Sequence, residues 1–93
     1  MLRVAAVGVL GPIAEELIFR GFLFARMLRA GINVHATIAL LAAGWALLHW
    51  SYSLPVIAVI FVAGILLGLA RWRTNSVIVP AAMHIIWNLF AVW

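Results

Sequence analysis

The chain has 93 residues, of which 69% are hydrophobic and 9% are charged, and it carries a net charge of +4. A soluble domain needs more polar surface than this, which argues against a soluble enzyme or a nucleic-acid-binding domain. About 20 apolar residues cross a bilayer as a helix, so the length allows about four spans and no second domain. We therefore expect an all-α, polytopic membrane helix bundle. The chain has no cysteine, which excludes a disulfide, a thiol nucleophile and a sulfur ligand.

The first apolar segment runs from about Val4 to Arg29 and is interrupted at Gly11-Pro12. Proline is favoured at the first position of a helix and is unfavourable in its interior. We therefore expect this segment to be broken at Pro12 or to start a fresh helix there. That arrangement would put Glu15 and Glu16 in the first turns, near the positive end of the helix dipole.

A second helix is expected from about Val34 to Trp50, after a turn at residues 30–33. In this turn Gly31 suits the end of one helix, and Asn33 suits the N-cap of the next.

A third helix is expected from Pro55 to about Arg71. Gly64 and Gly68 form a GxxxG step, which lets helices approach closely in a bilayer. Ordinary packing is the favoured interpretation of this step. Self-association across the same face, giving a homo-oligomer, is the other.

The last segment is expected from Val77 to Trp93, after a hydrophilic stretch at residues 71–76. Like the first segment, it is expected to be broken or started at a proline, here Pro80. A helix that begins there places His84 in its opening turns.

Four arginines flank the expected spans: two end the first helix and two end the third. An alternating path puts all four on one side of the membrane, and the positive-inside rule makes that side cytoplasmic. We therefore expect a multi-pass integral protein, of a bacterial or archaeal plasma membrane. The four residues are Arg26, Arg29, Arg71 and Arg73.

Glu15 and Glu16 are the only carboxylates, and with Arg20 they lie inside an apolar run. An ionisable side chain near the bilayer centre costs roughly 2.5–3.5 kcal/mol, so such residues usually face a bundle interior and serve a function. The spacing of Glu16 and Arg20 suits an ion pair. Adjacent helical residues point about 100° apart, so Glu15 is expected to turn toward His49 instead.

Few other polar side chains lie within the apolar runs. His84 and Asn88 share one helix face, and Trp45 and His49 have the same spacing. Any one of them alone is typical of a contact between helices, and His35 at a helix start suits the membrane interface. Together, on three successive helices, they predict a site.

The chain has no aspartate, no H-E-x-x-H motif and no G-x-S-x-G motif. What remains is a carboxylate with a histidine as base on a water, and a histidine with an asparagine as oxyanion donors.

Three short motifs, in this order and about thirty residues apart, resemble the CAAX-prenyl-protease and bacteriocin-processing (CPBP, or ABI) family. The surrounding EELIFRGFLF and GILLGLARWRTNSVIVPAAMH look like the same family. The motifs are Glu15-Glu16-x-x-x-Arg20, Trp45-x-x-x-His49 and His84-x-x-x-Asn88.

The resemblance implies an intramembrane glutamate endopeptidase that needs no metal or other cofactor. Its substrates would be membrane-anchored proteins or peptides, including prenylated CAAX-type ones. It assigns water activation to Glu15 and His49 and the oxyanion hole to His84 and Asn88, with Glu16 and Arg20 in support.

Two features depart from the family pattern. The second motif usually begins with Phe and here has Trp45, and family members usually carry helices before the first motif. We therefore expect residues 1–93 to be a single catalytic core that lacks upstream helices.

Two alternatives stay open. One is a non-catalytic immunity, chaperone or transport-linked membrane protein. The other is a protease with a metal ion on Glu15, His49 and His84, a ligand set that zinc would accept.

Overall fold

A computed structural model describes the backbone of residues 6–92 and the side chains of residues 8–90. All regular structure in this part of the chain is helical, which confirms the predicted all-α architecture. The expected outer ends of the first and last segments, Val4 and Trp93, lie outside the described residues.

The first segment is one continuous helical rod in which α-helical and π-helical winding alternate. Pro12 is the second residue of an α-helical stretch, as expected, but the preceding Leu10 keeps helical angles (φ −67°, ψ −41°). The interruption is therefore a change of winding. A wider turn before a proline relieves the clash between its ring and the preceding turn. The rod comprises η1 (Ala6–Leu10), α2 (Gly11–Glu16), η2 (Leu17–Leu23) and α3 (Phe24–Arg29).

Because the rod continues through Pro12, both glutamates lie in its middle and not at a free helix N-terminus.

Helix α4 (Val34–Leu47) begins as predicted. Gly31 has φ +90°, and the Asn33 side chain accepts a hydrogen bond of 2.8 Å from the backbone N–H of Ala36. The helix ends three residues earlier than expected, because the chain tightens into turns joined by bonds to the third residue back. His49 therefore lies in the turn that follows α4.

Helix α5 (Leu54–Thr74) has Pro55 in its first turn and ends at Asn75, which is left-handed at φ 51°. Its two spaced glycines are buried against α4. A Cβ on Gly68 would lie 2.8 Å from Cγ2 of Ile38, so only glycine allows this approach. The packing interpretation of the GxxxG step is confirmed. The same face of α5 is covered by α4 of this chain.

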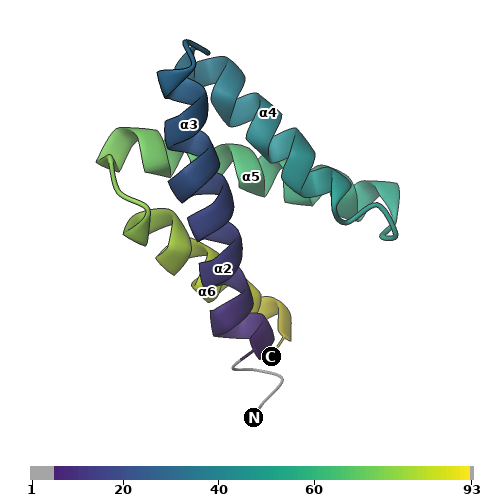
Figure 1. Cartoon of the computed structure of the whole chain (residues 1–93). Helices are drawn as coiled ribbons and strands as arrows, with labels where there is room; N and C mark the ends of the chain where they lie inside the picture. The colour runs from purple at the N-terminus through teal and green to yellow at the C-terminus, as the bar shows by residue number, and fades with distance from the viewer. Residues whose placement is uncertain (1–5, 93) are drawn as a thin grey trace.

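Helix α6 (Ile78–Val92) starts two residues before the buried Pro80 and runs beside α2 and η1. Helices α4 and α5 form a second pair, and this pair crosses the first rod (Figure 1). The start of α4 and the last turns of α5 lie close together, with the His35 and Trp72 rings 5.4 Å apart. The Arg71 guanidinium of α5 lies 4.7 Å from the ring centroid of Phe24, the first residue of α3.

The distribution of polarity is inverted relative to a soluble protein. Glu16, Arg20 and His84 are at most 3% exposed, while many large apolar side chains lie on the surface. In a bilayer this arrangement is favourable, because lipid covers the apolar exterior and charges pair inside. By length and composition α5 can cross a membrane, and two further apolar helices are shorter. The most exposed apolar residues are Phe90, Leu54, Trp50 and Ile78.

Candidate functional site

The two adjacent glutamates have different surroundings. Glu16 is fully buried, and its Oε2 accepts hydrogen bonds from Nη1 of Arg20 at 3.1 Å and from Nδ1 of His84 at 2.8 Å. The predicted ion pair is therefore present, and a histidine from α6 joins it. Because a carboxylate only accepts, the His84 proton on this side is carried by Nδ1. Glu16 therefore links the first rod to α6.

Arg20 connects the same cluster to α5. Its Nη2 donates a hydrogen bond of 2.8 Å to the carbonyl of Gly64, and its guanidinium lies 5.1 Å from the Trp45 ring centroid. The glycine that lets α5 approach α4 thus also supplies an acceptor for the buried arginine.

The π-helical stretch η2 explains how Arg20 makes a further backbone contact. The N–H of Phe24 bonds to the carbonyls of Phe19 and Gly21 and bypasses that of Arg20. The Arg20 carbonyl instead accepts a hydrogen bond of 2.8 Å from Nε of Arg71. Widened turns of this kind occur frequently at functional sites.

Glu15 occupies a more open position, with 41% of its side chain exposed. Its Oε1 accepts a hydrogen bond of 2.9 Å from Nε1 of Trp45 and lies 3.8 Å from Nε2 of His84. Among the described residues, Glu15 makes no hydrogen bond to His49. The two residues are linked through Trp45, whose indole N–H binds Glu15 and whose carbonyl binds His49.

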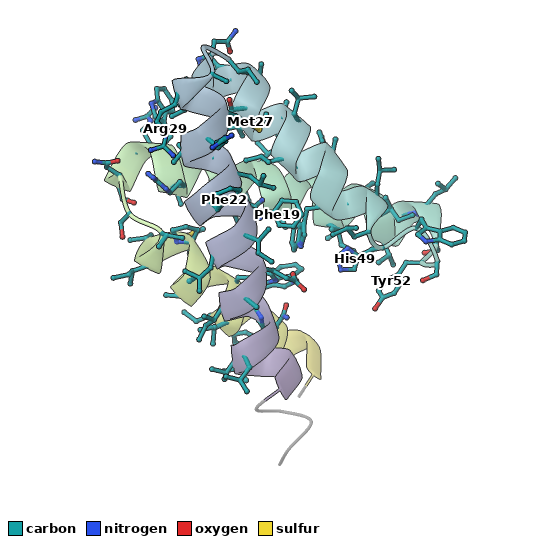
Figure 2. The ribbon with its side chains drawn as sticks, in the orientation of Figure 1. Phe19, Phe22, Met27, Arg29, His49 and Tyr52 are labelled. Carbon is teal, nitrogen blue, oxygen red and sulfur yellow. The ribbon has the colours of Figure 1, made fainter. Side chains whose placement is uncertain are left out.

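His49 is fixed by the backbone of the preceding turn. Its Nδ1 donates a hydrogen bond of 2.9 Å to the carbonyl of Trp45, because a carbonyl can only accept. In the neutral ring Nε2 then holds the free lone pair. The centroid of the His49 ring lies 5.7 Å from the ring centroids of Trp45 and Tyr52. His49 and Tyr52 both follow the end of α4 (Figure 2).

The remaining predicted residues come from α6. The His84 ring is 5.1 Å from that of Trp45, so the two histidines flank one indole. Asn88 lies one turn further along α6 and is half-buried. Within the described part of the chain, no three His or Glu side chains are grouped closely enough to hold a metal ion.

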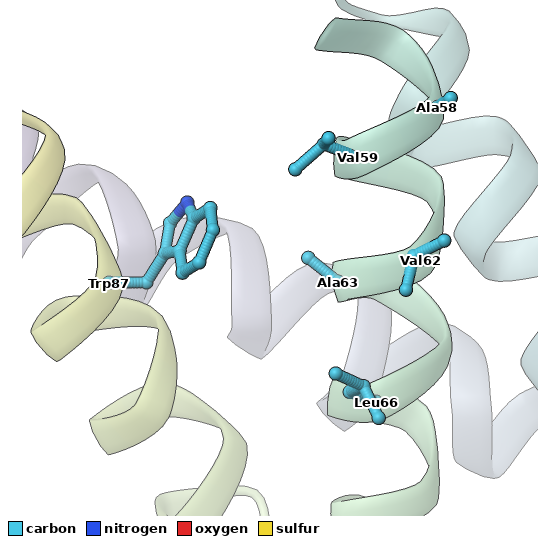
Figure 3. A pocket seen from close by; sticks show the side chains of 6 residues that line it. All are labelled: Ala58, Val59, Val62, Ala63, Leu66 and Trp87. Carbon is cyan, nitrogen blue, oxygen red and sulfur yellow. The ribbon is translucent and has the colours of Figure 1, made fainter. Parts of the chain in front are cut away.

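An apolar groove of about 360 Å³ lies between α5 and α6. Figure 3 shows the Trp87 indole facing Val59 and Ala63 of α5 across it. Trp87 sits between His84 and Asn88 in sequence, three residues after the histidine. The lining of this groove includes none of the predicted site residues. Its lining residues are Ala58, Val59, Val62, Ala63, Leu66 and Trp87.

The fold and the site together define a small helical protein with an apolar exterior and a buried glutamate–arginine–histidine centre. The sequence model of the family described as type II CAAX prenyl endopeptidase Rce1-like matches residues 1–90. The chain belongs to this family, which is membrane-embedded and has CAAX-type endopeptidase activity. This finding confirms the resemblance drawn from the three motifs. No curated protein and no solved structure gives a significant match to the chain.

Proposed function

We propose that this chain is the catalytic core of an intramembrane endopeptidase that hydrolyses peptide bonds of membrane-associated, prenylated CAAX-type substrates without a metal ion. Glu15 and His49 activate the water, and His84 and Asn88 hold the oxyanion. Glu16 and Arg20 support the site.

This proposal rests on the difference in exposure between the two glutamates. Glu16 is fully buried, and its Oε2 is bound by Arg20 and His84, so it has no access to a substrate. Glu15 is partly exposed, and both of its described contacts are made through Oε1. Its Oε2 is then the oxygen that can take a proton from water. A general base needs this combination of fixed position and access.

The chemical step follows from these roles. A water loses a proton to Glu15, with the His49 Nε2 lone pair as its second acceptor, while its oxygen attacks the scissile carbonyl carbon. The carbonyl oxygen becomes an oxyanion, which accepts hydrogen bonds from the Asn88 amide and, when His84 is protonated on both nitrogens, from its Nε2. The C–N bond then breaks as the proton passes from Glu15 to the leaving amine. In such a site preorganised donors supply the electrophilic assistance that a metal would otherwise give.

The apolar groove supports a lipid-modified substrate. Its lining carries only hydrocarbon and one indole, so it favours a chain without polar groups. Trp87 follows His84 by three residues on α6, so a prenyl chain in this groove would lie along the helix that also carries the two oxyanion residues.

The test is a cleavage assay on prenylated and unmodified CAAX-type peptides with purified wild type and Glu15→Gln. We expect Glu15→Gln to lose at least about 10²-fold in kcat, the usual contribution of a general base, while it stays folded. Arg73→Gln, a charge removal at an exposed position, is the matched control and should keep wild-type turnover. Equal turnover of Glu15→Gln and wild type would refute the base assignment, and a folded wild type without any cleavage would favour the non-catalytic alternative.

A further inference from the structure

Trp45 contacts four polar residues of the site, although its own side chain is neither an acid nor a base. They are Glu15, Arg20, His49 and His84. Trp45 is 4% exposed and comes from the last turn of α4. Its indole N–H binds Glu15 at 2.9 Å, and its backbone carbonyl accepts the Nδ1 proton of His49, also at 2.9 Å. One residue thus holds both groups that the proposed function assigns to water activation.

The indole ring is itself held in place from three sides. Its centroid is 5.1 Å from that of His84 and 5.1 Å from the guanidinium carbon of Arg20. A Cβ on Gly64 would lie only 3.1 Å from Cε3 of the ring, so the indole rests against the α5 backbone. A side chain packed in this way has a single orientation, and its N–H has a single direction.

Glu15 needs such a fixed donor more than Glu16 does. Its side chain is 41% exposed, and the ion pair of its neighbour does not restrain it. Without the indole N–H, its carboxylate would be free to rotate among several rotamers on the open side of the site. The bond to Oε1 selects one of them and keeps Oε2 available.

We propose that Trp45 is a positioning residue, which fixes the Glu15 carboxylate through its indole N–H for the hydrolysis proposed above. The inference rests on that proposed function for its kinetic consequence. The hydrogen bond itself can be tested without any activity.

Trp45→Phe is the informative substitution, because it keeps an aromatic ring against His84 and Gly64 and removes the N–H donor. A misplacement of about 1 Å can lower a rate about 10²-fold, so we expect kcat to fall about 10- to 100-fold with KM little changed. Trp72→Phe makes the same chemical change at the other end of the α4–α5 pair and should keep wild-type kcat.

Nuclear magnetic resonance of indole-¹⁵N-labelled protein in detergent tests the contact directly. The Trp45 signal is identified by its loss in Trp45→Phe. Because a bond to a carboxylate is stronger than one to an amide, Glu15→Gln should move this indole proton upfield and leave the other tryptophan signals in place.

The results separate the two proposals. If wild type cleaves no peptide but the Trp45 signal responds to Glu15→Gln, the proposed function fails and the contact stands. If no indole signal moves in Glu15→Gln, the inference is overturned, and this reading needs no assignment from Trp45→Phe. A Trp45→Phe enzyme that matches Trp72→Phe in kcat or is changed only in KM overturns it as well.

Discussion

Adding a single methyl group at Gly64 should damage both stability and the site. A Cβ at this position would lie 3.0 Å from Cα and Cβ of Ala42 and 3.1 Å from Cε3 of Trp45. Carbon atoms pack best at about 3.5–4.0 Å, so α4 and α5 have to separate by roughly half an ångström. Two of these three atoms are Cα and Cβ of Ala42, and an alanine cannot move its Cβ away by changing a rotamer.

The free-energy change combines two opposing effects. Overpacking of a close contact costs about 1–3 kcal/mol. Replacing glycine by alanine inside a helix recovers about 0.5–1 kcal/mol. We therefore expect Gly64→Ala to lower the free energy of unfolding by about 1–2 kcal/mol. Turnover by the folded protein should fall as well, because the same shift moves Trp45 and the carbonyl that binds Arg20.

Two other glycines provide matched controls. A Cβ added to Gly44 on α4 would meet no neighbouring atom within 4 Å, so Gly44→Ala should be neutral or stabilising. A Cβ on Gly68 would meet the Ile38 side chain at 2.8 Å. Gly68→Ala should therefore destabilise the α4–α5 contact, while turnover per folded molecule stays near that of wild type, because the three nearest atoms that the new Cβ would meet all belong to Ile38 and none to a polar site residue.

The assay is unfolding of the purified variants by sodium dodecyl sulfate from a mild detergent, followed by circular dichroism, alongside peptide cleavage. The reasoning is refuted if Gly64→Ala matches Gly44→Ala in both stability and turnover. Equal losses of turnover per folded molecule in Gly64→Ala and Gly68→Ala would show that the effect is general loosening and does not act through Trp45.

Two further predictions concern α6 and the π-helical stretch. Asn88→Ala should lower kcat about 10²- to 10³-fold with KM little changed, which is the usual effect of losing one oxyanion donor. The measurement is steady-state kinetics, and a raised KM at constant kcat would contradict this role. Arg71→Gln removes a charged hydrogen bond to the Arg20 carbonyl, which is worth roughly 1.5–3 kcal/mol. Because this bond holds η2 at its widened turn, we expect kcat to fall by about tenfold or more. The neighbouring Arg73→Gln is the control, and equal kcat values for the two variants would argue against a role for Arg71.

The sequence predicts the fold well because its helix boundaries carry local signals. Asn33 caps α4, Gly31 has a positive φ, and both later helices have proline in their first turn, as expected from propensity alone. The continuous rod through Pro12 is not predictable in this way. Pro12 predicts a disturbance of the helix but not its form, because a chain can break before a proline or continue through a wider turn.

The site is predictable in part. Spacing alone indicates the Glu16–Arg20 pair, because residues four apart meet on a helix. The contact of His84 with that pair and the Gly64 carbonyl as an acceptor depend on how the two helix pairs cross, which no local pattern encodes. By motif alone, Trp45 is only an aromatic replacement for phenylalanine. The signal that indicates more is its N–H, because a buried indole usually finds a hydrogen-bond partner.

The two glutamates also differ in what a mutation can reveal about them. Glu16 is one member of a buried ion pair, and removing one partner of such a pair typically costs about 3–5 kcal/mol because the other charge is left unpaired. Loss of activity on changing Glu16 or Arg20 would therefore follow from a disturbed fold whatever their role in the reaction. Glu15 is partly exposed and held by a neutral donor, so its carboxylate can be neutralised with a much smaller effect on stability. Variants of Glu15 and Trp45 that stay folded are consequently the ones that distinguish a catalytic centre from a polar cluster that only holds the helices together.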